Sequence, residues 1–126
     1  MFNAGSRDTG AAAEARALAH LQRQGLVLVE RNYRVARGPR ARGGEVDLIL
    51  RTGDGTLVFC EVRARGTAAH GGAASSVVAA KQRALVFAAQ HYLQRFATPP
   101  PCRFDVVAVD GDRLEWLAGA FDAAAW

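Results

Sequence analysis

Two acidic side chains on neighbouring predicted strands could together bind a divalent cation. Asp47 lies in GEVDLILR and Glu61 in LVFCEVRA, with thirteen residues between them. The loop TGDGT, residues 52–56, is typical of a tight hairpin connection. Closing the hairpin between its two threonines sets Asp47 opposite Glu61, with Cβ atoms roughly 4.5–5.5 Å apart.

Two carboxylates at this separation repel each other, so a compensating charge is expected nearby. Mg²⁺ or Mn²⁺ would suit the pair, because these hard ions take oxygen ligands and keep positions for water and a phosphate. A salt-bridge network is the other interpretation, with Arg63 and Arg65 neutralising both acids. A register slip of one residue would break the pairing altogether.

The same register gives the hairpin two different faces, because side chains alternate along a strand. The face that carries Asp47 and Glu61 changes from apolar near the turn to charged at the far end, where Glu45 is predicted to stand opposite Arg63. The other face is predicted to be core and carries Val46, Leu48, Leu50, Val58, Cys60 and Val62.

Turn signals and apolar periodicity predict the elements that must position this hairpin. A first helix is capped by Asp8 or Thr9, and a second is capped by Ser75 or Ser76. The order α-β-β-β-α-β-β predicts one mixed α/β domain over residues 1–126. The predicted ranges are a helix to about residue 24, strands 26–35, 44–51 and 57–65, a helix to about 96, and strands 104–109 and 113–117.

The segment ARGPRARGG, residues 36–44, is predicted to be a flexible basic loop, since it has no apolar period and is dense in Gly, Pro and Arg. Guanidinium groups suit phosphate oxygens and give affinity without sequence selectivity. A solvated loop without a ligand is the alternative. The predicted nucleic-acid contacts are Arg34, Arg37, Arg40, Arg42 and Arg65.

Composition sets further limits on the class of protein. The net charge is +4 and the pI about 9.8, which favours anionic partners. No apolar run approaches the length of a membrane span, the first residues lack a secretory layout, and two cysteines are too few for a disulfide framework. We therefore expect a cytoplasmic protein without membrane contact.

Five blocks of the sequence resemble the YraN-like family of bacterial proteins, which is similar to Holliday junction resolvases of the PD-(D/E)xK nuclease superfamily. Together they cover nearly the whole chain. The resemblance implies a restriction endonuclease-like fold, a mixed sheet flanked by helices. The blocks are Gly10, Glu14 and Ala17, then GEVDLI at 44–49, VFCEVRAR at 58–65, AAKQRAL at 79–85 and RFDVV at 103–107.

The resemblance also implies roles for three further residues. The superfamily lysine of Glu-x-Lys is replaced here by Arg63, which keeps its proton and cannot act as a base. Lys81, the only lysine among sixteen cations, is a candidate replacement, because its helical stripe should project toward the sheet. Glu14 starts the inward stripe of the first helix and matches a resolvase glutamate that joins the metal site. The alternative for Lys81 is an ordinary surface lysine, and the alternative for Glu14 is an acid favoured by the helix dipole in the first turns.

These observations predict a metal-dependent endonuclease-like protein that hydrolyses phosphodiesters in branched or structured DNA. Asp47 and Glu61 would hold Mg²⁺ or Mn²⁺, with Glu14, Arg63 and Lys81 completing the site. A resolvase-like function would favour a homodimer, since two strands must be cut. A non-catalytic nucleic-acid-binding module on the same fold is the alternative, and a protein-interaction scaffold is the third.

Overall fold

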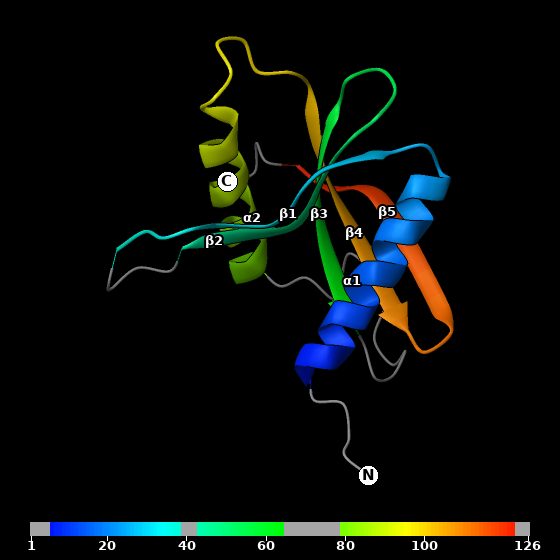
Figure 1. The fold of residues 1–126 in the computed structure, drawn as a ribbon. Helices are drawn as coiled ribbons and strands as arrows, with labels where there is room; N and C mark the ends of the chain where they lie inside the picture. The colour runs from blue at the N-terminus through cyan, green and yellow to red at the C-terminus, as the bar shows by residue number, and fades with distance from the viewer. Residues whose placement is uncertain (1–5, 39–42, 65–78, 123–126) are drawn as a thin grey trace.

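A five-stranded mixed sheet lies between two helices in the computed structural model, which describes residues 6–38, 43–64 and 79–122 (Figure 1). This architecture and its element order confirm the predicted α-β-β-β-α-β-β arrangement. The elements are α1 (Ser6–Arg23), β1 (Val27–Val35), β2 (Gly44–Arg51), β3 (Leu57–Ala64), α2 (Ala79–Leu93), β4 (Cys102–Asp110) and β5 (Arg113–Phe121).

The strands follow the order β1-β2-β3-β4-β5 across the sheet. The β3–β4 pair is parallel, and the other three pairs are antiparallel. A parallel pair needs a long crossover, and α2 lies in the connection between these two strands. Within the described ranges, no helix has the length and apolar character that crossing a bilayer requires.

Each helix covers one face of the sheet (Figure 1). On the α1 side, Ala17 and Leu21 pack against β2, β3 and β4, and on the α2 side Leu85 and Tyr92 pack against Phe59. Burial on both faces explains why the central strands read as almost continuous apolar runs.

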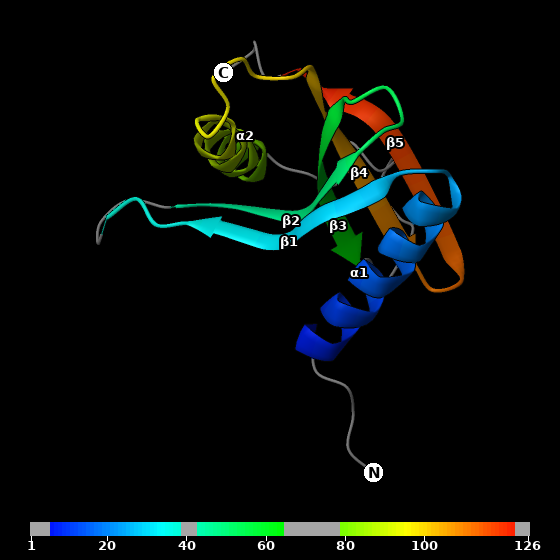
Figure 2. The ribbon, with the colours of Figure 1, turned by 45° about the horizontal axis from the view of Figure 1, so that its top comes forward.

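The ends of β1 and β2 extend past α2 and form an arm, which we define as residues 33–38 and 43–46 (Figure 2). Two contacts tie the start of the arm and the strand before it to the helix. The hydroxyl of Tyr33 lies 2.7 Å from Nδ1 of His91, and Arg95 pairs with Glu30 across 3.9 Å. The arm therefore has a fixed position relative to α2.

The predicted start of α1 and the predicted end of β5 need correction. Helix α1 begins at Ser6, before the predicted caps. Strand β5 continues to Phe121 instead of stopping at 117, because a register shift between Phe104 and Val106, together with the positive φ of Gly119 (64°), lets it resume pairing with β4. The predicted cap of the second helix, residues 75 and 76, lies outside the described residues.

The predicted hairpin register is confirmed only near the turn. Arg51 pairs with Leu57 and Leu48 with Cys60, as expected, but the ladder ends there. Strand β2 stays paired with β1 as far as Gly44, whereas β3 stays paired with β4. Asp47 and Glu61 are therefore not a ladder pair, and neither are Glu45 and Arg63.

The parting of the strands also corrects one predicted core position. Val46 packs in the α2 cluster with Ile49 and Phe59, not in the α1 cluster that holds Leu48 and Leu50. Strict alternation would put Val46 and Leu48 on the same face. The change of side shows that β2 turns sharply as it leaves β3.

Gly44 allows the arm and α2 to approach closely. A Cβ atom on this residue would lie 2.5 Å from the carbonyl oxygen of Ala84 and 2.8 Å from the amide nitrogen of Ala88. Both are helix main-chain atoms, which cannot move aside without shifting α2. The position of the helix on the arm therefore depends on the missing side chain.

We expect Gly44→Ala to lower the free energy of unfolding by about 1–3 kcal/mol, because one added methyl group forces α2 off the arm. Urea denaturation monitored by circular dichroism measures the change. Gly53→Ala is the matched control, since a Cβ there meets nothing within 4 Å. Equal urea midpoints for the two variants would contradict the close-packing account.

Candidate functional site

The site lies where β2 and β3 separate. Beyond Leu48 the main chain of β2 no longer bonds to β3, and the side chain of Asp47 makes the connection instead. Its Oδ2 accepts a hydrogen bond of 2.8 Å from the amide of Val62. Asp47 is thereby held toward β3 even though the ladder has ended.

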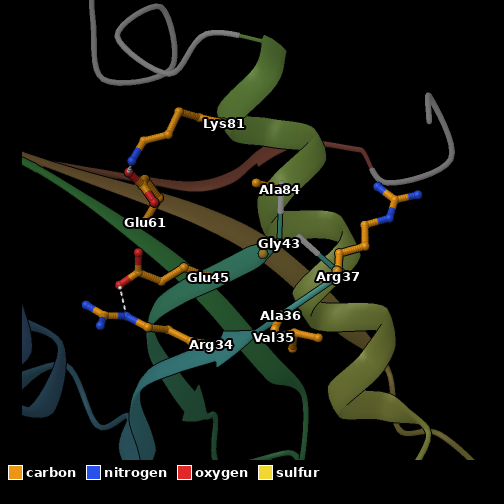
Figure 3. A pocket seen from close by; sticks show the side chains of 11 residues that line it. Arg34, Val35, Ala36, Arg37, Gly43, Glu45, Glu61, Lys81 and Ala84 are labelled. Carbon is orange, nitrogen blue, oxygen red and sulfur yellow. Dashed lines mark hydrogen bonds and ion pairs between the residues drawn. The ribbon is translucent and has the colours of Figure 1, made fainter. Parts of the chain in front are cut away.

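Glu61 occupies the β3 side of the same opening and faces α2. Its side chain is only 7% exposed, and its Oε2 lies 3.3 Å from Nζ of Lys81 (Figure 3). The lysine is 46% exposed, so its ammonium reaches inward from the edge of the site. This contact confirms the predicted inward projection of Lys81 from the first turns of the described helix.

Burial and mutual repulsion make the acidic pair easier to protonate than ordinary carboxyl groups. Burial, with repulsion from Asp47 as the second cause, raises the pKa of Glu61 to about 7, against a partial opposing effect of Lys81. Burial also raises the pKa of Asp47, while hydrogen bonds from the Val62 amide and from Glu61 act to lower it. The two carboxyl groups therefore titrate as an interacting pair, and a proton on Glu61 allows it to donate a hydrogen bond to Asp47.

Glu14 approaches the pair from α1, as predicted. Its side chain is partly buried, and burial, followed by repulsion from Asp47, raises its pKa. Asn32 of β1, which has a positive φ of 51°, hydrogen-bonds to Glu14. No sequence pattern pointed to Asn32 as a site residue, although asparagine tolerates this conformation better than most residues.

Glu45 is a site residue whose role sequence reasoning missed. It stands two positions before Asp47 on β2. Burial is the largest cause of the raised pKa values of Asp47 and Glu14, and repulsion from Glu45 is a smaller cause that acts in the same direction. Its Oε2 accepts a bond of 3.1 Å from Nε of Arg34. The available signal was the i, i+2 spacing, which puts Glu45 on the same side of the strand as Asp47. The predicted register instead pairs Glu45 with Arg63.

The two ion pairs, Lys81–Glu61 and Arg34–Glu45, border an open hollow of about 540 Å³ between the arm and α2. Figure 3 shows Lys81 and Glu61 on one side and the Arg34–Glu45 pair on the other, with Arg37 beyond them on the arm. The hollow thus brings two ion pairs and a further arginine to one opening. Main-chain atoms of residues 43 and 44 form part of its lining.

Arg63 does not neutralise the acids in the way that the salt-bridge interpretation required. It lowers the pKa of Glu61 only as a minor cause, and the ion pair of Glu61 is with Lys81. The Nε of Arg63 is buried and has no hydrogen-bond partner among the described residues. Arg63 is therefore near the pair without being its main counter-charge.

The predicted arginine contacts are placed only in part. Arg34 and Arg37 are exposed on the arm and line the hollow. The remaining three, Arg40, Arg42 and Arg65, lie outside the described residues.

A second buried acid, Asp105, has the full set of hydrogen-bond donors expected of a carboxylate that stabilises the fold. Asp105 of β4 is fully buried and accepts four hydrogen bonds. Two come from Arg103, one from the indole of Trp116 at 2.9 Å and one from the amide of Gly119 at 3.0 Å. The bonds from Trp116 and Gly119 anchor β5 to β4. The Asp47–Glu61 pair has no comparable set of donors among the described residues.

The donor set suits a hard divalent ion. Within the described ranges, no three His, Cys, Asp or Glu side chains form a ready-made metal cluster. Mg²⁺ is commonly bound by only one or two carboxylates together with water and substrate phosphates, however. Asp47 and Glu61 supply that number of carboxylates, and Glu61 lines the open hollow.

The fold and site define a mixed α/β protein in which two neighbouring acids, Asp47 and Glu61, and Lys81 meet where β2 separates from β3. The chain belongs to the uncharacterised protein family UPF0102, whose model matches residues 13–109. This match confirms the YraN-like family predicted from the sequence blocks.

Two relatives illustrate the similarity. A UPF0102 protein of Methylibium petroleiphilum is 63% identical over 119 residues, covering 94% of this chain and 98% of the relative. A UPF0102 protein of an Acidovorax species is 65% identical over 119 residues, covering 94% and 88%. The likeness thus spans the elements that build the site.

We expect stability to fall as pH rises from about 4.5 to 7, and Glu61→Gln to reduce this fall. The unfolded state loses the Glu61 proton near the ordinary pKa of 4.5, whereas the folded state keeps it up to a pKa of about 7. The folded state therefore binds more protons in this window, which makes the slope negative. Urea denaturation across the pH range measures it.

Glu115→Gln is the control, because it removes an exposed acid of β5. The prediction fails if Glu61→Gln shows the same pH slope as wild type and the control.

Proposed function

We propose that this protein is a metal-dependent endonuclease-like enzyme that hydrolyses phosphodiesters in branched or otherwise structured DNA. The observation that carries the proposal is the geometry at the strand opening, where Asp47 and Glu61 are coupled, poorly compensated and next to the only lysine of the chain. Residues kept in mutual repulsion contribute little to folding, so a function is the better reason for them.

The contrast with Asp105 supports this reasoning. That acid is more deeply buried than Glu61 but has four donors, so the fold can stabilise a carboxylate where structure requires it. The acidic pair has one amide and one ammonium as partners. An added divalent cation would remove the repulsion that the chain itself leaves in place.

In this proposal Asp47 and Glu61 hold Mg²⁺ or Mn²⁺, and Glu14 supports them from α1. The ion, when bound, polarises the phosphate and favours ionisation of water. Lys81 places an ammonium at the mouth of the hollow, where it stabilises negative charge on the phosphate. Arg34 and Arg37 bind neighbouring phosphates of the DNA backbone.

The link to branched DNA comes from the resemblance of the five sequence blocks to Holliday junction resolvases and from the restriction endonuclease-like fold that it implies. The positive charge is consistent with a polyanionic partner. A homodimer would be needed for cutting two strands at one junction.

A second candidate function is a non-catalytic DNA-binding module, and Arg63 is the observation that favours it. Arginine occupies the position where the superfamily has lysine, and it keeps its proton at any working pH. If the reaction needs a group there that can give up a proton, the fold binds DNA without cutting it.

A cleavage assay with Mg²⁺ or Mn²⁺ on four-way junction and flapped DNA separates these functions. We expect Lys81→Arg, which keeps the charge but not the ammonium, to lower the cleavage rate by about 100-fold or more while DNA affinity stays near that of wild type. Asp47→Asn should abolish cleavage, and Arg63→Lys should raise the rate or leave it unchanged.

Arg113→Ala is the control, because this exposed arginine starts β5 at the β4–β5 turn. If wild type cuts none of these substrates while Arg63→Lys does, the arginine is the lesion and the protein is a binder. If neither protein cuts, the enzymatic proposal is wrong.

A further inference from the structure

We propose that the hollow between the arm and α2 continues into a path for one unpaired DNA strand, with Phe87 as a stacking surface and Arg83 as a phosphate contact. This inference rests on the proposed function and names the form of its substrate. The site should take a single-stranded segment, as in a flap, an overhang or an opened junction, in preference to a continuous duplex.

A second, smaller hollow adjoins the first. It has a volume of about 150 Å³ and includes Arg83 and Phe87 in its lining. Arg37, Gly43 and Ala84 line both hollows, so the two meet where the arm lies on α2. Gly43 has no side chain to separate them, which leaves a route from Glu61 and Lys81 along the flank of the helix.

The cations along this route are candidates for phosphate contacts, although two of them are paired with the carboxylates Glu61 and Glu45. Lys81 and Arg34 lie at the first hollow, Arg37 borders both, and Arg83 borders the second. Arg37 and Arg83 thus extend the positive lining from the first hollow into the second. The phosphates of a single strand that passes through the site would therefore still contact arginines after they leave it.

The dimensions favour one strand over two. A volume of about 540 Å³ lies within the range of roughly 300–1,000 Å³ that holds small molecules, and so fits a group the size of a nucleotide. A nucleotide inside a continuous duplex is held by its paired and stacked base, so it would have to unpair before it could fill such a hollow.

Phe87 supplies a feature that only an unpaired base can use. Its ring is half-buried, and the guanidinium carbon of Arg37 lies 4.6 Å from the ring centroid. When Arg37 turns to a phosphate, the face of the ring becomes available. Sites for single strands combine a cationic groove with aromatic rings on which bases stack, whereas bases inside a duplex are already stacked.

The test measures binding without divalent ions, so that cleavage does not intervene. Fluorescence anisotropy with a labelled oligothymidylate and with a blunt duplex gives the two affinities. We expect Phe87→Leu to weaken single-strand binding by about 10-fold and leave duplex binding unchanged. Arg83→Ala should reduce the salt slope for the single strand by about 0.7.

Matched controls are Phe96→Leu, which changes another half-buried phenylalanine just past the end of α2, and Arg113→Ala at the β4–β5 turn. Circular dichroism checks that each variant is folded, and the exposed Arg83 gives a second variant with little effect on packing. Both controls should bind the single strand like wild type.

The proposed path is overturned if Phe87→Leu and Arg83→Ala bind the single strand as their controls do, or if they lose single strand and duplex equally. Cleavage of flapped DNA by wild type in that case leaves the proposed function standing. A wild type that binds neither single strand, duplex nor four-way junction overturns both proposals.

Discussion

The parting of β2 from β3 after the Leu48–Cys60 pair is the constraint on which the site depends. Each strand continues with its other neighbour, β2 with β1 and β3 with β4, so an opening forms inside a sheet that is otherwise continuous. Asp47 bridges the opening through the Val62 amide. The same divergence carries the arm past α2 and creates the hollow.

The helices then determine which groups reach this opening. Close packing of α2 on Gly44 brings Lys81 to Glu61, and α1 brings Glu14 toward Asp47. Elements from both faces of the sheet therefore meet at one place. A change in the packing of either helix would alter the electrostatics of the acidic pair without touching the acids themselves.

Much of this could be predicted from the sequence, because local signals were strong. The TGDGT turn fixed the register of the hairpin as far as Leu48, and the inward stripes of the helices placed Glu14 and Lys81 toward the site. Joint spacing of the five blocks identified the family.

The rest depends on tertiary geometry that a strand pattern does not encode. Alternation assumes a continuous ladder, so it predicted a direct Asp47–Glu61 pair and placed Val46 on the wrong side. It also predicted that Glu45 would pair with Arg63, whereas in the structure Glu45 pairs with Arg34 on the arm. Asn32 belongs to the site because its backbone has a positive φ, and the sequence pattern does not predict this conformation.

We propose that the acidic pair binds a divalent metal ion, and a crystal soaked in Mn²⁺ tests this proposal. Anomalous scattering should show one ion within about 2.0–2.4 Å of carboxylate oxygens of both Asp47 and Glu61, with Lys81 released from Glu61. A well-diffracting crystal soaked at millimolar Mn²⁺ that shows no ion there, with the Lys81–Glu61 contact intact, would contradict the account.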